Sequence, residues 1–299
     1  MKLKSRLFYG YILSLILYAA LVLIPRPSPA VLQQYRITAG HLRLLDITII
    51  VVLAAIWFAG FYGYSKFRDY AQMIRDTKDG RPVDLLAKGL LLLVLWLPVS
   101  SIISSALNDL ALKRPGWVQP TTIINHYVGM LLPLAAYLFI SLGARRLTRL
   151  AKHRPSFLAT NLLSILLIYI GVIYLRLVAT TANRDIVYQM SIWLVFLTIV
   201  APYVYMWSIG ILAAYELFLY SQKSPGFVYR KSWRLLAFGF GWLIITSVAF
   251  QYLTTLTARL QHLSLYALLL IVYALLAVLS VGFILIALGT RKLQKIEEV

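Results

Sequence analysis

Two aspartates and a glycine lie between two apolar runs, in the segment Asp76-Thr77-Lys78-Asp79-Gly80. Carboxylates at this spacing on the end of a helix can hold a divalent cation against a phosphate group. The same residues are typical of a turn that ends a helix, because Asp and Gly favour turn conformations. We favour the turn over the metal site.

This five-residue segment resembles the start of the CDP-alcohol phosphatidyltransferase signature. The resemblance implies a lipid-phosphate transferase that uses a metal. That family continues with two residues, Ala-Arg and further acidic residues, whereas Arg81-Pro82-Val83-Asp84 follow here. Because the second acidic pair is missing, the metal would lack ligands. We therefore expect no enzyme, and lipid-phosphate transfer stays a remote alternative.

Histidine and cysteine give no cofactor site. The chain has no cysteine, and its four histidines lie near the ends of apolar runs or between them. Haem held between membrane helices needs two histidines inside the spans. Zinc would need His41, His126 and His262 to converge from separate loops, with no ligand spacing to support it. We predict no metal and no cofactor.

Hydroxyl and amide side chains inside two of the apolar runs are the best candidates for a binding site. If these runs face each other, the side chains would line a small polar cavity, as in transporters that bind substrates between repeats. Alternatively, they let two membrane helices pack closely and hydrogen-bond to each other. The candidate cavity residues are Ser100, Ser101, Ser104, Ser105, Thr246, Ser247 and Gln251.

The composition is that of a membrane protein. Of 299 residues, 61% are hydrophobic and 13% are charged, against roughly 25% charged in soluble domains. A bilayer core needs about 20 apolar residues per helix. The sequence predicts an all-α bundle of eight transmembrane helices, near residues 7–25, 44–65, 86–107, 123–142, 157–178, 190–219, 235–256 and 264–288.

The basic residues predict the orientation. With the N-terminus inside, 21 of the 29 Lys and Arg lie on the cytoplasmic side of these spans. We expect a cytoplasmic (inner) membrane protein with both termini in the cytoplasm. The net charge of +19 is distributed between spans, which argues against nucleic acid. It fits topology signalling or contact with anionic headgroups.

A near repeat organises the chain. Ser141-Leu142-Gly143-Ala144-Arg145-Arg146-Leu147 recurs 146 residues later as Ala287-Leu288-Gly289-Thr290-Arg291-Lys292-Leu293. Both copies close an apolar run. We predict two parallel four-helix repeats, residues 1–153 and 154–299, related by an axis along the membrane normal.

Two functional classes remain. A transporter or channel-like protein for a small solute would explain the duplication and the polar residues within spans, and we favour it slightly. A non-catalytic scaffold or subunit of a membrane complex, bound to a protein partner, would explain the scarcity of charged groups within spans.

Overall fold

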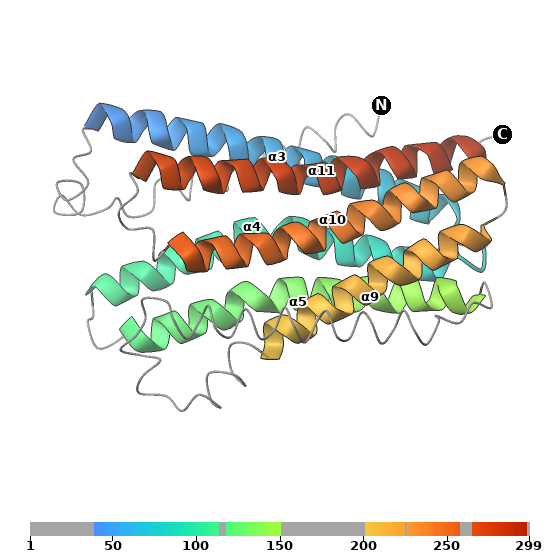
Figure 1. Ribbon diagram of the computed structural model, residues 1–299, viewed down its shortest axis with the longest axis horizontal. Coiled ribbons are helices and arrows are strands. Elements are labelled where there is room, and N and C mark those ends of the chain that lie inside the picture. Colours follow the sequence, from blue (N-terminus) through green and yellow to red (C-terminus); the bar gives the residue numbers. More distant parts are fainter. Residues whose placement is uncertain (1–38, 114–117, 151–200, 225, 258–264, 298–299) are drawn as a thin grey trace.

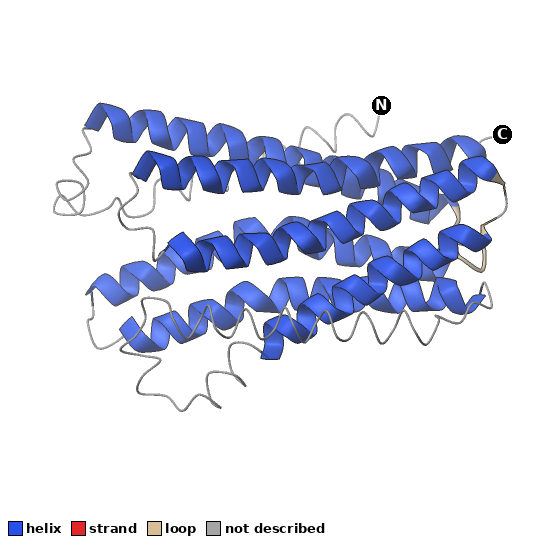
Figure 2. Ribbon diagram, viewed as in Figure 1, coloured by secondary structure: helices blue, strands red, loops and turns tan. Residues whose placement is uncertain are grey.

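The described part of the chain forms six long helices (Figures 1 and 2). The computed structural model describes residues 39–113, 118–150, 201–224, 226–257 and 265–297. The helices run roughly along one common direction (Figure 1). They are α3 (Ala39–Met73), α4 (Gly80–Lys113), α5 (Val118–Leu150), α9 (Ala201–Lys223), α10 (Phe227–Thr257) and α11 (Leu265–Glu297).

The six helices close into a ring. Each has two principal neighbours, in the order α3, α4, α5, α9, α10, α11 and back to α3. The chain thus supplies α3, α4 and α5 consecutively, then α9, α10 and α11 consecutively. The two groups of three meet where α5 contacts α9 and where α11 contacts α3.

Four of these helices are long and apolar enough to cross a membrane, among the residues whose side chains are described. This fits the prediction of a membrane protein. The predicted spans at 7–25 and 157–178, and the first part of 190–219, lie outside the described residues, so the count of eight stays a prediction. The four segments are Leu131–Arg149, Val204–Lys223, Phe227–Ala249 and Ala277–Ile296.

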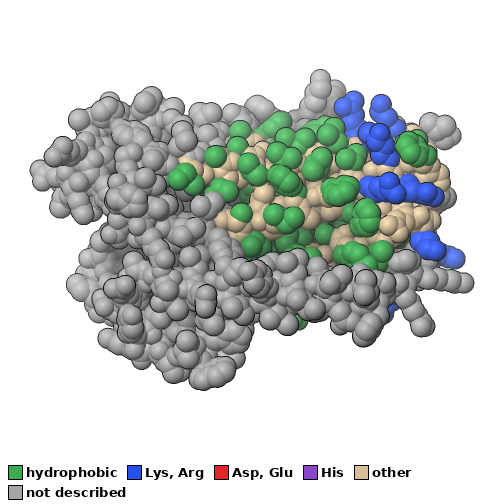
Figure 3. Space-filling view, viewed as in Figure 1, with side chains coloured by type: hydrophobic (Ala, Val, Ile, Leu, Met, Phe, Trp, Pro, Cys, Tyr) green, Lys and Arg blue, Asp and Glu red, His purple; other side chains and the backbone are tan. Residues whose placement is uncertain are grey.

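Basic side chains gather at one end of the bundle (Figure 3). We call this the basic end: α3, α5, α9 and α11 finish there, and α4 and α10 begin there. The turn from α3 to α4 is tight, since Thr77 N donates to Ile74 O at 2.9 Å and Gly80 N donates to Thr77 O at 3.1 Å. A Cβ at Gly80 would collide with the carbonyl oxygen of Ile74, so this turn requires glycine.

Glycines let the neighbouring helices pack closely. A Cβ added at Gly89 would lie 2.6 Å from Cγ1 of Ile140, across the contact between α4 and α5. A Cβ added at Gly239 would lie 2.7 Å from Cγ1 of Ile286, across the contact between α10 and α11. Small residues at such contacts are how membrane helices gain close packing without a hydrophobic driving force.

Candidate functional site

Aromatic side chains fill the interior of the ring near the basic end. Phe67 of α3 and Phe240 of α10 meet edge to face, with ring centroids 6.3 Å apart, although their helices are not principal neighbours. Trp233 packs edge-on against Tyr220 with centroids 4.8 Å apart. Phe67, Phe240 and Trp233 are almost completely buried. The interior of the ring is therefore packed at this level.

Two hydrogen bonds link parts of the ring that are not direct neighbours. The hydroxyl groups of Tyr70 and Tyr229 form a hydrogen bond, with their oxygens 2.9 Å apart. The hydroxyl of Tyr220 donates to Oδ2 of Asp79 at 2.8 Å. Each bond connects the last turns of one helix to the start of a helix in the other group of three. We call Phe67, Tyr70, Tyr220, Tyr229 and Phe240 the aromatic layer.

The acidic motif takes part in this structural contact. Asp79 precedes the first residue of α4, and its carbonyl oxygen accepts the hydrogen bond from Val83 N at 3.0 Å. Its carboxylate accepts the hydrogen bond from Tyr220, while Asp76 is exposed. Among the described residues, no group of His, Cys, Asp and Glu is placed to hold a metal ion. The backbone hydrogen bonds of Thr77 N and Gly80 N show that the segment forms the turn that its residue types favour.

Two of the candidate cavity residues have described side chains, and both are buried. Thr246 Oγ1 donates to Trp242 O at 2.7 Å, within its own helix. Ser247 Oγ lies 2.8 Å from Ile244 O and 3.0 Å from the hydroxyl of Tyr137. Because Ser247 belongs to α10 and Tyr137 to α5, this contact also crosses the ring.

The other candidate residues are placed only by their helices. Ser100, Ser101, Ser104 and Ser105 belong to α4, and Gln251 belongs to α10, but their side chains are outside the described part. α4 and α10 stand on opposite sides of the ring and are not principal neighbours. The polar cavity between them stays a prediction.

Tyr137 was not predicted from the sequence as a polar partner of Ser247. The sequence alone assigns tyrosines near span ends to the aromatic belt. Tyr137 is instead 1% exposed, and its hydroxyl reaches a partner 110 residues away. The only feature of the sequence that could have indicated a buried hydroxyl here is the position of Tyr137 within an apolar run, four residues after Pro133.

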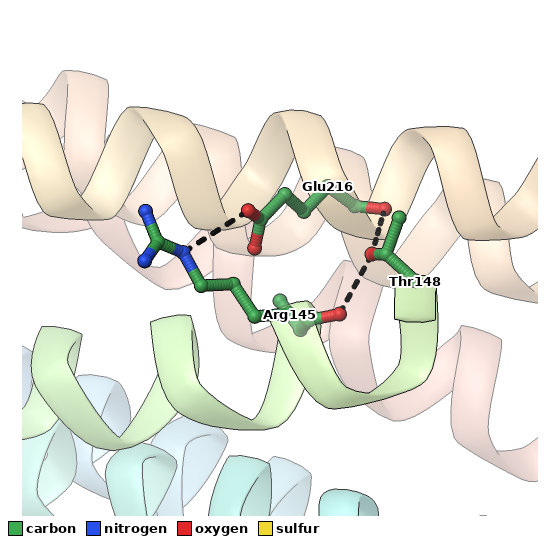
Figure 4. A network of polar contacts seen from close by, with 4 residues as sticks. Arg145, Thr148 and Glu216 are labelled. Atoms are coloured by element: carbon green, nitrogen blue, oxygen red, sulfur yellow. Dashed lines mark hydrogen bonds and ion pairs between the residues drawn. The ribbon is translucent and has the colours of Figure 1, made fainter. Parts of the chain in front are cut away.

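A polar network joins α5 to α9 at the basic end (Figure 4). Arg145 Nε lies 3.2 Å from Oε1 of Glu216, whose side chain is only 13% exposed. Thr148 Oγ1 donates to Ala144 O at 2.7 Å and approaches the carbonyl oxygen of Glu216 at 3.3 Å. The second contact between the two groups of helices has a similar bond, from Gln294 Nε2 to Lys66 O at 3.0 Å.

Comparison of the chain with family models, with curated proteins and with solved structures finds no match.

Proposed function

We propose that the chain consists of two similar halves, each of which contributes three of the described helices to the ring. Residues 150 positions apart correspond between α3 and α9 and between α4 and α10, and residues 146 positions apart correspond between α5 and α11. The order of helix contacts supports this pairing of helices, because α3–α4–α5 is matched in order by α9–α10–α11. So do the glycine contacts, since Gly89 and Ile140 correspond to Gly239 and Ile286.

The observation that carries the proposal is a reciprocal pair of contacts. Tyr70 bonds to position 229 of the other half, and Tyr220, its counterpart, bonds to position 79, the counterpart of 229. Likewise Thr148 reaches the carbonyl oxygen of Glu216, and its counterpart Gln294 reaches that of Lys66. Reciprocal contacts are what two copies give when they pack about a twofold axis.

In this proposal the halves are parallel repeats of four spans in the cytoplasmic membrane. The basic end faces the cytoplasm, because Lys and Arg are retained on that side. Both termini then lie in the cytoplasm. Parallel repeats are related by an axis along the membrane normal, which here would run through the centre of the ring.

The activity that this arrangement supports best is passage of a small solute along the shared axis. Transporters built from repeats place their substrates at the interface between the repeats. Here that interface carries the hydroxyls of Tyr137 and Ser247, beside a packed aromatic layer at the basic end. Transport requires that this layer open and close, as a gate between the axis and the cytoplasm.

Flux through reconstituted vesicles tests this activity. Vesicles with the purified chain are given a panel of small neutral and charged solutes, and their swelling is followed by light scattering. We expect Ser101→Leu and Ser247→Leu to abolish flux while the protein stays folded. Ser280→Leu is the matched control, because Ser280 Oγ also bonds a carbonyl three residues back, that of Ala277, but on a more exposed face of α11.

Unchanged flux in both serine variants would remove this site from the proposal. A wild-type chain that passes no solute of the panel would count against transport itself.

A scaffold or subunit role is the second candidate. The packed aromatic interior near the basic end favours it, since a structural bundle needs no opening along its axis. Affinity capture from solubilised membranes would then recover a protein partner at fixed stoichiometry. A chain that purifies alone and monodisperse would contradict this role.

A further inference from the structure

A cleft lined by basic side chains opens at the basic end of the first half, among the ends of α3, α4 and α5. Its volume is about 600 Å³. We call it the cationic cleft. Its charged lining residues are Arg68, Arg75, Arg81, Lys88 and Arg146, with Asp76 and Asp84.

The charges in the cationic cleft do not balance. Five of its side chains are basic and two are acidic. Of the two, Asp84 is engaged by Lys88, with Oδ2 and Nζ 2.9 Å apart. A concave surface lined by charges of one sign concentrates the potential and attracts ions of the opposite sign. The four arginine forks and the lysine ammonium suit phosphate oxygens in particular.

In the second half, aromatic residues replace two of the basic residues of the cleft. In the proposed register Arg68 corresponds to Phe218 and Lys88 corresponds to Phe238. These two phenylalanines contact each other edge to face, with ring centroids 6.1 Å apart. The Phe238 side chain is 59% exposed on the outside of the bundle. Because Phe238 is the counterpart of Lys88, its exposed ring indicates that lipid surrounds the bundle at the depth of the cleft.

We infer that the cationic cleft binds a phosphate group at the membrane surface, and that its source is the headgroup of an anionic phospholipid. The depth marked by Phe238 favours a lipid over free phosphate, because a lipid there keeps its acyl chains in the bilayer. The excess of basic side chains in the cleft is observed in the first half and does not depend on the proposed duplication. Only the comparison of depth depends on the proposed duplication.

Lipid titration of the full chain in neutral detergent tests this site. Phosphatidylglycerol, phosphatidylcholine and inorganic phosphate are added separately, binding is read from the shift in unfolding temperature, and native mass spectrometry counts bound lipids. The variants are Arg146→Ala and the double substitution Arg68→Gln with Lys88→Gln. Lys292→Ala is the matched control, because Lys292 is the exposed counterpart of Arg146 in the second half.

We expect phosphatidylglycerol to raise the unfolding temperature of the wild-type protein and of Lys292→Ala, and phosphatidylcholine to have little effect. Each basic residue removed from the cleft should weaken lipid binding about fivefold. An equal response to inorganic phosphate would overturn the lipid source while supporting the phosphate site. Equal responses to both lipids, or unaltered binding in the cleft variants, would overturn the site. Because binding is measured without flux, either result is independent of transport.

Discussion

At the scale of single residues, glycines set the distance between neighbouring helices. Gly239 has no room for a side chain, since an added Cβ would lie 2.7 Å from Cγ1 of Ile286 and 2.9 Å from the carbonyl oxygen of Gly282. Gly241, two residues along the same helix, has room, because its added Cβ would lie 3.5 Å from Cβ of Ala214. Substitution by alanine at these two positions therefore distinguishes the effect of helix packing from the effect of helix propensity.

We predict that Gly239→Ala lowers the free energy of unfolding by about 1 to 3 kcal/mol, because α10 and α11 would have to move apart. Gly241→Ala is the control, and it should leave stability unchanged or raise it by up to about 1 kcal/mol, since alanine favours helix. Thermal unfolding in detergent measures both. Equal effects of the two substitutions would show that these glycines do not set the helix spacing.

The ion pair between α5 and α9 makes a second prediction. Arg145→Ala should destabilise the protein by about 1 kcal/mol, because it leaves the largely buried carboxylate of Glu216 without its partner. The estimate is modest because Arg145 is half exposed and its charge is screened. The same substitution in a Glu216→Gln background should cost less. A double-mutant cycle measures this coupling, and additive effects of the two changes would mean that the pair contributes nothing.

At the scale of helices, the bond from Tyr220 to Asp79 fixes the end of α9 against the turn before α4. Tyr220→Phe removes a hydrogen bond to a carboxylate and should cost about 1.5 to 3 kcal/mol. If the aromatic layer is a gate, the variant should also pass solute faster than the wild-type chain. Tyr205→Phe, at a side chain 58% exposed, is the control and should change neither property.

The sequence predicted the elements better than their register. The apolar runs predicted the helices because crossing a bilayer demands a fixed length of apolar chain. The residue types of Asp76-Thr77-Lys78-Asp79-Gly80 predicted a turn that ends a helix, and α3 does end before this segment, at Met73.

The register of the two halves was harder to predict. The sequence was aligned mainly at a spacing of 146 residues, although it also contains pairs at 150, such as Tyr70 with Tyr220. In the proposed duplication, the contacts fit a spacing of 150 residues for α3 with α9 and for α4 with α10. Four residues are about one helical turn, so both spacings put apolar residues on the same face and periodicity cannot separate them.

The candidate site was predicted only in part. Intramembrane polarity singled out Ser247, which contacts a hydroxyl across the ring. The partner Tyr137, and the crossing bonds of Tyr70 and Tyr220, join residues more than 100 positions apart. Such pairs depend on how the helices pack around the ring. The hydrophobic periodicity of a single helix does not predict that packing.

At the scale of the whole molecule, the account depends on two halves that enter the membrane in the same direction. Arg146 and Lys292 are counterparts in this arrangement, at the basic end of α5 and of α11. The chain has no cysteine of its own, so single cysteines can be placed at either position without a background reaction.

Labelling of Arg146→Cys and Lys292→Cys with a maleimide that cannot cross membranes tests this claim most directly. Intact cells and inverted membrane vesicles are labelled in parallel. We predict that both cysteines are protected in cells and react in inverted vesicles, which places both basic ends in the cytoplasm. Reaction of the two cysteines from opposite sides would contradict the parallel halves, and reaction of both in intact cells would contradict the orientation.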